Sequence, residues 1–180
     1  MNKLFISILL VLISFSSYSQ EYYRDTTIER AIFNEVNRHR DSLGLHMVKF
    51  NLDNILASPW AETLVKHDLE TGGEIYHCGC NPGIEIIALH VIGDEHSITM
   101  GVDEIAKKIV VSWDESPSHK EGMEDINMKR GFNAVYVFKS KRWGGKYAAI
   151  SVYQFIRDKE YYINLDWDEN KKVPNQFLDE

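Results

Sequence analysis

The chain has 180 residues, of which 44% are hydrophobic and 26% are charged, and its formal net charge is -7. This composition is typical of a globular protein and excludes a disordered or fibrous chain, while the length predicts one domain with one substantial core. The excess of acidic residues disfavours nucleic acids and acidic membranes as partners, because both would be repelled by the surface.

The first twenty residues have the layout of a secretory signal peptide. Lys3 is followed by an apolar run from Leu4 to Phe15 and then by a short polar stretch of small residues. The run is too short to span a bilayer permanently. Its removal would take Lys3 away and bring the net charge to -8. We therefore expect a secreted or periplasmic protein, with an uncleaved N-terminal anchor as the alternative. Lipidation is not expected, because the first cysteine is Cys78.

An amphipathic helix is predicted after the signal peptide. Residues 26 to 29, Thr-Thr-Ile-Glu, have the spacing of a capping box, which predicts a helix start at Thr26. Gly44 provides the stop. The apolar stripe of this helix is formed by Ile28, Ile32, Val36 and Leu43.

Two further helices are predicted from the same periodicity. Residues 52 to 69 form an amphipathic stretch, and Pro59 within it predicts a kink or a late start. The clearest helical pattern covers residues 102 to 113 and is closed by Pro117. A second capping box at residues 118 to 121 then places His119 in the first turn of a short helix.

The remaining elements are predicted to be strands. Residues 71 to 101 are irregular and rich in glycine around one apolar run, 84 to 92, which predicts a buried strand. Residues 132 to 139 and 147 to 155 are rich in aromatic and branched side chains, and a glycine-containing turn separates them, so they predict an antiparallel hairpin. Because both of its faces are apolar, helices should cover the sheet on each side in a layered α/β arrangement.

The two cysteines, Cys78 and Cys80, are too few for a disulfide framework. A bridge across one intervening residue would have a Cα separation near the edge of the permitted range. Together with the adjacent His77 the pair also offers three zinc ligands, although zinc sites usually have two to four residues between cysteines. Free thiols, a bridge and metal ligands all remain open from the sequence.

Two of the seven histidines lie where side chains can converge on a cleft. His77 precedes the glycine-rich loop, and His119 follows the segment from Trp113 to Ser118. We interpret His39, His46 and His67 as structural or solvated residues.

These features together resemble a known family. The segments concerned are residues 37 to 45, a second helix over 52 to 69, His77, Gly-Ile-Glu-Ile-Ile-Ala at 83 to 88, Trp113-x-x-Ser116-Pro117-x-His119, and Gly-Phe-Asn-Ala at 131 to 134 before a terminal hairpin. They look like the bacterial form of the CAP superfamily, named for cysteine-rich secretory proteins, antigen 5 and pathogenesis-related 1 proteins, whose domain is also called SCP. The resemblance covers about residues 28 to 156 and gives the organisation as a signal peptide (1–20), a CAP domain (21–156) and a charged C-terminal tail (157–180).

The resemblance implies a three-layer α/β/α sandwich with a small antiparallel sheet and a central cleft lined by two histidines and two acids. Carried over to this chain, the histidines are His77 and His119 and the first acid is Glu85. Ser116 stands where the family usually has the second acid, with Glu115 adjacent. His77, His119 and Glu85 would suit Zn²⁺ or another divalent cation. Without a metal, the same groups would form a hydrogen-bonded polar cluster.

Three functions follow as hypotheses. The first is a binding module whose cleft takes a divalent metal, a small molecule or a lipid; the resemblance implies lipid or sterol binding or an extracellular effector role. The second is a metal-dependent, peptidase-like hydrolase, in which a metal-bound water is the nucleophile. The third is a structural envelope protein. A serine nucleophile at Ser116 is disfavoured, because Ser116-Pro117 is also an ordinary helix-ending turn.

Overall fold

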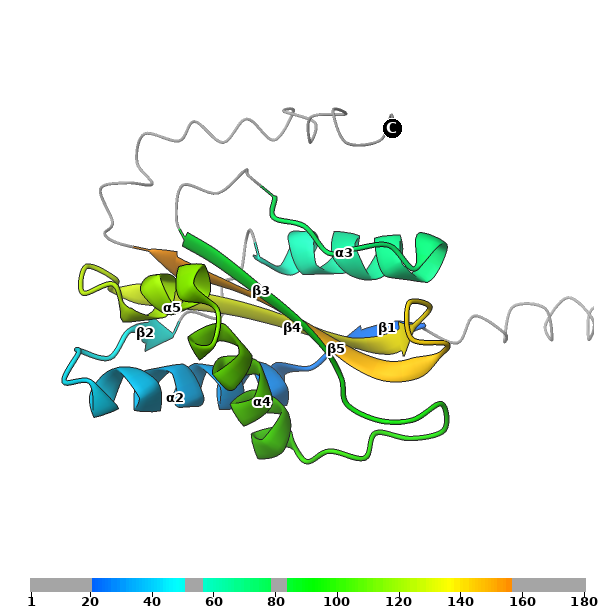
Figure 1. Cartoon of the computed structure of the whole chain (residues 1–180), viewed down its shortest axis with the longest axis horizontal. Helices are drawn as coiled ribbons and strands as arrows, with labels where there is room; N and C mark the ends of the chain where they lie inside the picture. Colours follow the sequence, from blue (N-terminus) through cyan, green and yellow to red (C-terminus); the bar gives the residue numbers. More distant parts are fainter. Residues whose placement is uncertain (1–20, 51–56, 79–83, 157–180) are drawn as a thin grey trace, which may run out of the picture.

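A computed structural model describes residues 21–50, 57–78 and 84–156 and shows a mixed α/β fold (Figure 1). The predicted signal peptide and C-terminal tail lie outside these residues. The helices are α2 (Thr26–Ser42), α3 (Ala57–Thr71), α4 (Val102–Asp114) and α5 (Pro117–Glu124). The strands are β1 (Tyr22–Arg24), β2 (Lys49–Phe50), β3 (Ile84–Val91), β4 (Arg130–Ser140) and β5 (Lys146–Ile156).

These strands form one five-stranded, mainly antiparallel sheet. Its order is β1-β4-β5-β3, and β2 adds to β4 in parallel. The β4–β5 hairpin predicted from the sequence is confirmed, with pairing from Arg130 opposite Ile156 to Ser140 opposite Lys146. Gly144 and Gly145 in its turn have φ values of 65° and 86°, a conformation that other residues rarely adopt. Strand β3 is an edge strand, since within the described residues it pairs with β5 alone.

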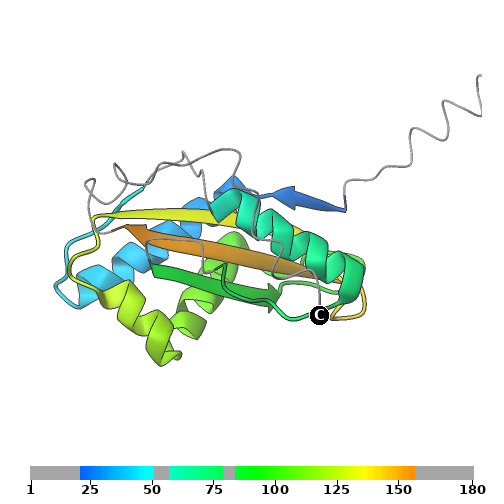
Figure 2. The same cartoon turned by 90° about the horizontal axis from the view of Figure 1, so that it is seen from above.

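Helices cover both faces of the sheet, as the apolar character of the hairpin predicts. Alternate residues of β4 enter two separate cores, with Val135 and Val137 in one and Ala134 and Phe138 in the other. The first core is shared with α2, α4 and α5, and the second with α3. Of the described helices, α3 is the one that lies above the sheet in Figure 1 and in front of it in Figure 2. Each fully buried aliphatic side chain stabilises this arrangement by roughly 1.5–3 kcal/mol.

The start of α2 differs from the predicted capping box. The N-cap is Asp25, whose carboxylate accepts hydrogen bonds from the backbone N–H groups of Thr27 and Ile28. Glu29 does not reach back to the cap. It is fully buried, forms a 2.6 Å ion pair with Arg24 and accepts a hydrogen bond from the N–H of Val135. The prediction was wrong because packing of α2 on β1 and β4 gives Glu29 stronger partners than the helix terminus.

The end of α2 follows the prediction in part. Gly44 has a φ of 71° and its N–H donates to the carbonyl of Asp41, which terminates the helix. Leu43, however, is the C-cap and is exposed rather than part of the buried stripe. The last buried apolar residue of the helix is therefore Val36, about two turns before Leu43, and the buried face ends at Arg40.

Helices α3 and α5 begin near prolines. Helix α3 starts at Ala57, two residues before Pro59, which confirms the late start; residues 51 to 56 lie outside the described part of the chain. Pro117 is the first residue of α5 and follows the N-cap Ser116, so the predicted capping box at Ser118 is wrong. His119 nevertheless lies in the first turn of a short helix, as expected.

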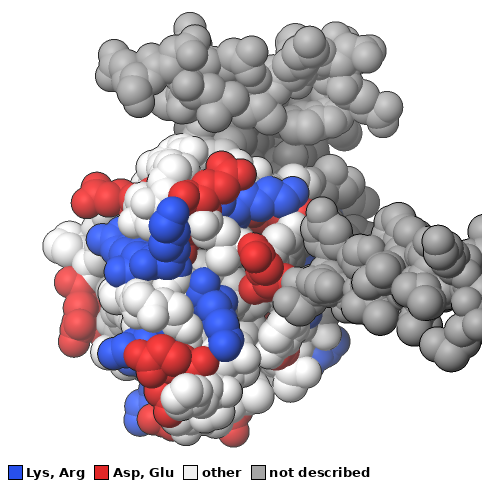
Figure 3. All heavy atoms as spheres, turned by 90° about the vertical axis from the view of Figure 1, so that its right-hand side faces the viewer, with Lys and Arg blue, Asp and Glu red and all other residues white. Residues whose placement is uncertain are grey.

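No helix among residues 21–50, 57–78 and 84–156 combines the length and apolarity needed to cross a membrane. On the face shown in Figure 3, basic and acidic side chains are interspersed, so no field of a single sign covers it.

Candidate functional site

Three residues that are distant in the sequence meet at the edge strand β3. His77 lies in the segment that follows α3, Glu85 is the second residue of β3, and His119 lies in α5. The ring centroids of His77 and His119 are 5.9 Å apart with an interplanar angle of 60°. Nδ1 of His77 lies 3.1 Å from Oε1 of Glu85. The structure thus brings together the two histidines and the acid expected from the family resemblance.

The alternation of β3 explains how the site is assembled. Ile86 and Ala88 enter the core shared with α2 and α4, whereas Ile87 enters the core under α3. Because side chains alternate along a strand, Glu85 lies on the α3 face together with Ile87. His119 comes from α5, which packs on the other face. The two imidazoles therefore meet around the edge of the sheet, where no neighbouring strand separates them in the described part of the chain.

Glu85 is the fixed member of the group. Its side chain is only 7% exposed, whereas that of His77 is 54% exposed. Oε1 also accepts a hydrogen bond from the N–H of Cys78 at 3.1 Å, and Gln154 on the paired strand donates to Oε2 at 3.4 Å. A carboxylate beside Nδ1 favours the tautomer that has its proton on Nδ1, which leaves the lone pair of His77 on Nε2.

The second imidazole has a different environment. His119 is half-buried, and burial, followed by the nearby charge of His77, lowers its pKa below the ordinary value of 6.5. His119 is therefore a neutral imidazole near neutral pH, with one ring nitrogen able to accept a hydrogen bond or coordinate a cation.

Two other predicted site residues lie apart from these groups. Glu115 is the exposed C-cap of α4. Ser116 is half-buried at the N-cap of α5, where its carbonyl accepts from the N–H of Lys120. Neither side chain forms a hydrogen bond or ion pair with His77 or His119 in the described residues. The structure therefore supplies no acid at the second acidic position of the family and no base for a Ser116 nucleophile.

The state of Cys78 bears on the alternatives left open by the sequence. Cys78 is disulfide-bonded in the structure. The chain has one other cysteine, Cys80, which lies outside the described residues. Of the three alternatives, the bridge is the one that agrees with the structure, and a bridged sulfur is not available as a thiolate ligand.

A second polar group, which the sequence did not predict, joins α2, α4 and α5. Among the described residues, His39, Asp114 and Glu124 are the set that brings three potential metal-ligand atoms within 4.8 Å of one another. Nε2 of His39 lies 3.1 Å from Glu124, and the ammonium of Lys120 lies 2.8 Å from Asp114 and 3.7 Å from Glu124. Lys120 thus already supplies a cation, and we assign the group as an ion-pair network. Only the i, i+4 spacing of Lys120 and Glu124 is visible in the sequence.

Comparisons with known proteins give little further information. No protein-family model matches the chain, and no curated protein matches it. Among solved structures, an outer surface protein from Borrelia burgdorferi is similar with a TM-score of 0.48 and 15% identity, over 76% of this chain and 98% of that protein. At this level the likeness carries no argument about function.

Proposed function

We propose that this chain is an exported protein of the CAP type, whose α/β/α sandwich carries a cleft at His77, Glu85 and His119 that binds a divalent cation or a small polar ligand. The observation that supports the proposal most directly is the 5.9 Å separation of the two imidazole rings beside a carboxylate. Export is proposed from the layout of residues 1 to 20.

The donor set fits a borderline cation such as Zn²⁺. Neutral imidazole is a preferred ligand of zinc, and a carboxylate that accepts from the Nδ1–H of a histidine orients the ring and increases its basicity. His77 and His119 would hold the ion through ring nitrogens, and Glu85 would orient His77 or enter as a third ligand. Because the three residues do not place one ligand atom each within 4.8 Å, a rotation of the exposed His77 ring is required on binding.

A bound zinc ion would act as a Lewis acid and lower the pKa of a coordinated water. The chain's own contribution would be to keep His119 neutral through its burial, and to orient the ring of His77 through the contact with Glu85. Hydrolysis is therefore the alternative function to simple binding, and the two are separated by turnover.

The proposal is tested by isothermal titration calorimetry, in which Zn²⁺ is titrated into the purified chain near neutral pH and the heat of binding is measured. We expect about one equivalent to bind, and His77→Ala and His119→Ala to weaken binding by at least about tenfold, as loss of a ligand does. His96→Ala is the control, because His96 is exposed in a loop outside the cleft. If His39→Ala abolishes binding while His119→Ala leaves it unchanged, the ion-pair network is the site and the proposal is wrong.

The same variants decide between binding and catalysis. The zinc-loaded chain is assayed for turnover of peptides and esters, with His119→Ala as the comparison. Turnover that is lost in this variant assigns a hydrolase, whereas zinc binding without turnover assigns a binding module. If zinc does not bind and His77→Ala only lowers stability, the cleft is a structural polar cluster.

A further inference from the structure

The disulfide bond of Cys78 lies beside the candidate cleft. Cys78 is bridged, and Cys80 is the one other cysteine of the chain. Cys78 directly follows His77, and its N–H donates to Oε1 of Glu85 at 3.1 Å. The same oxygen lies 3.1 Å from Nδ1 of His77. One carboxylate oxygen therefore contacts both the imidazole of His77 and the backbone of the bridged cysteine.

This bridge contributes little to the stability of the fold. A disulfide stabilises mainly by restricting the unfolded chain, and the effect increases with the length of the loop that it closes. Here only Gly79 separates the two cysteines, so the closed loop is very short. The backbone of Cys78 is also held independently of the bridge, by its hydrogen bond to the nearly buried Glu85. The fold and the cleft should therefore persist when the bridge is reduced.

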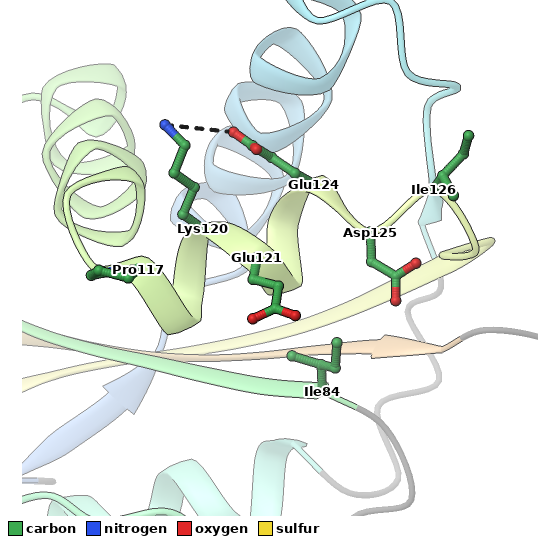
Figure 4. A pocket seen from close by; sticks show the side chains of 7 residues that line it. All are labelled: Ile84, Pro117, Lys120, Glu121, Glu124, Asp125 and Ile126. Carbon is green, nitrogen blue, oxygen red and sulfur yellow. Dashed lines mark ion pairs between the residues drawn. The ribbon is translucent and has the colours of Figure 1, made fainter.

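The opposite side of the cleft is held in place by the packing of α5 on β3. Figure 4 shows α5 above Ile84, the first residue of β3. The approach is close, since a Cβ added to Gly122 would lie 2.6 Å from Cγ2 of Ile84. Glu85 is the next residue of the strand, and His119 lies on α5, so this packing fixes them relative to each other. A change in the ligand set would therefore come from the segment of His77 and Cys78.

The cleft has fewer ligands than a closed zinc site requires. His77, His119 and Glu85 supply at most three, whereas a closed site has four protein ligands and an open site keeps one position for water or another ligand. Thiolate is a preferred ligand of zinc, but a bridged sulfur is not a thiolate. Sγ of a cysteine is three bonds from its own backbone nitrogen. Because this nitrogen of Cys78 bonds Glu85, the reduced sulfur would lie within reach of a cation at that carboxylate.

We propose that the bridge of Cys78 is a redox switch of the metal site: while it is intact, a bound cation keeps an open position, and after reduction the thiolate of Cys78 occupies that position. This inference rests on the proposed metal binding by His77, Glu85 and His119. The reductant is a dithiol, whose thiolate attacks one bridge sulfur and whose second thiol resolves the mixed disulfide. Two electrons and two protons pass to the cysteines, and the dithiol leaves as a disulfide. Coordination then releases the thiol proton of Cys78 to solvent.

The two states of the switch would differ in what the cleft can do. In an oxidising compartment the bridge persists, so an exported chain would keep the fourth position of the cation open for a ligand. In the reduced chain the thiolate fills this position, and the additional ligand holds the cation more tightly. The redox state would therefore decide whether the cleft presents the cation to a ligand or only retains it.

The test is a titration of Zn²⁺ and Co²⁺ into the full purified chain near neutral pH, before and after reduction. The reductant is a phosphine, which is removed under argon before the metal is added. Cobalt occupies tetrahedral zinc sites, and its coordination by thiolate gives a charge-transfer absorption band in the near ultraviolet. We expect the reduced chain to bind Zn²⁺ at least about tenfold more tightly than the oxidised chain, as gain of a ligand does. The absorption band should appear in the reduced chain alone.

Two matched variants, both kept under reductant, identify the sulfur. Cys80→Ser leaves Cys78 as a thiol and should bind Zn²⁺ as tightly as the reduced chain, with the cobalt band. Cys78→Ser leaves Cys80 as the thiol and should bind only as tightly as the oxidised chain, without the band. His119→Ala should weaken binding to the reduced chain at least about tenfold, because imidazole and thiolate share one ion. Circular dichroism of each variant establishes that it is folded.

The outcomes separate this inference from the proposed function. Equal affinity of the oxidised and reduced chains, without the band, would overturn the switch and leave the metal site in place. The switch is also overturned if Cys78→Ser keeps the tight binding, or if the tight binding does not depend on His119. Binding by the reduced chain alone, with dependence on both residues, would support Cys78 as a ligand and contradict the proposed function of the oxidised chain. Absence of zinc binding in both states would overturn both.

Discussion

Arg40 is a buried arginine that ties α2 to the C-terminal end of α5. It is 0% exposed, and its hydrogen bonds go to backbone carbonyls. Nη1 donates to the carbonyls of Met123 and Asp125, the latter at 3.1 Å, and Nε donates to that of His46 at 3.0 Å. Burial lowers the pKa of the guanidinium, but arginine stays protonated in proteins. We predict that Arg40→Met strongly destabilises the fold.

The size of the effect follows from two opposing terms. A hydrogen bond from a charged donor contributes about 1.5–3 kcal/mol, and the substitution removes three. Burial of the guanidinium costs several kcal/mol, a cost that methionine avoids, while its chain retains the packing of the arginine stem. The net loss is about 3 kcal/mol. For a chain of this size that corresponds to a fall in Tm of about 6–12 °C.

Urea denaturation followed by circular dichroism measures this loss, provided that the transition is two-state. Arg38→Met is the matched control, since Arg38 is 72% exposed and pairs on the surface with Glu35, and it should cost less than about 0.5 kcal/mol. Hydrogen exchange of the α5 amides should also accelerate in Arg40→Met more than that of the β4–β5 hairpin. A loss below about 1 kcal/mol, or one equal to that of the control, would refute the assignment of Arg40 as the tie of α5.

Three further predictions concern two histidine pKa values and the packing of α5 on β3. NMR titration should give His119 a pKa below the ordinary value of 6.5. His77→Gln should raise the pKa of His119, because the charge of His77 contributes to its lowering. An unchanged pKa in this variant would contradict the contact between the two histidines. His90 also has a pKa lowered by burial, so the unfolded chain binds more protons than the folded one below about pH 6.5, and stability should fall on acidification. The slope between about pH 7.5 and 5.5, from urea denaturation, should be smaller in His90→Gln. Gly122→Ala should destabilise the fold by about 1–3 kcal/mol, because its Cβ would lie 2.6 Å from Cγ2 of Ile84. Ile84→Ala in the same chain should remove most of this added cost. A gain in stability, which the same substitution gives in an open helix, would refute the close contact.

Elements with strong local periodicity were predicted well from the sequence. Helix α4, strand β3 and the β4–β5 hairpin follow the expected ranges closely. Each is determined by the alternation of apolar and polar residues and by the glycines of a turn, which act within a few positions of the chain. The apolar character of both faces of the hairpin was also sufficient to predict helices on each side.

Features that depend on tertiary contacts could not be predicted in this way. Glu29 has the spacing of a cap residue, and only its contacts with Arg24 and with the backbone of Val135 show that it is buried instead. The network of His39 with Asp114 joins separate helices, and no local pattern signals it. The approach of His77 to His119 was expected from their settings beside irregular segments and from the family resemblance. Local spacing could not show it, since the two residues belong to different elements on opposite sides of β3.

The position of α5 links these features to the proposed cleft. An eight-residue helix has little stability of its own, so its place is set by tertiary contacts. Those contacts are the bonds from Arg40, the close approach of Gly122 to Ile84, and the pair of His39 with Glu124. His119 lies on this same helix, and a shift of α5 would therefore change its distance to His77. Loss of Arg40 should accordingly weaken ligand binding in the cleft, even though its hydrogen bonds go to backbone carbonyls outside the cleft.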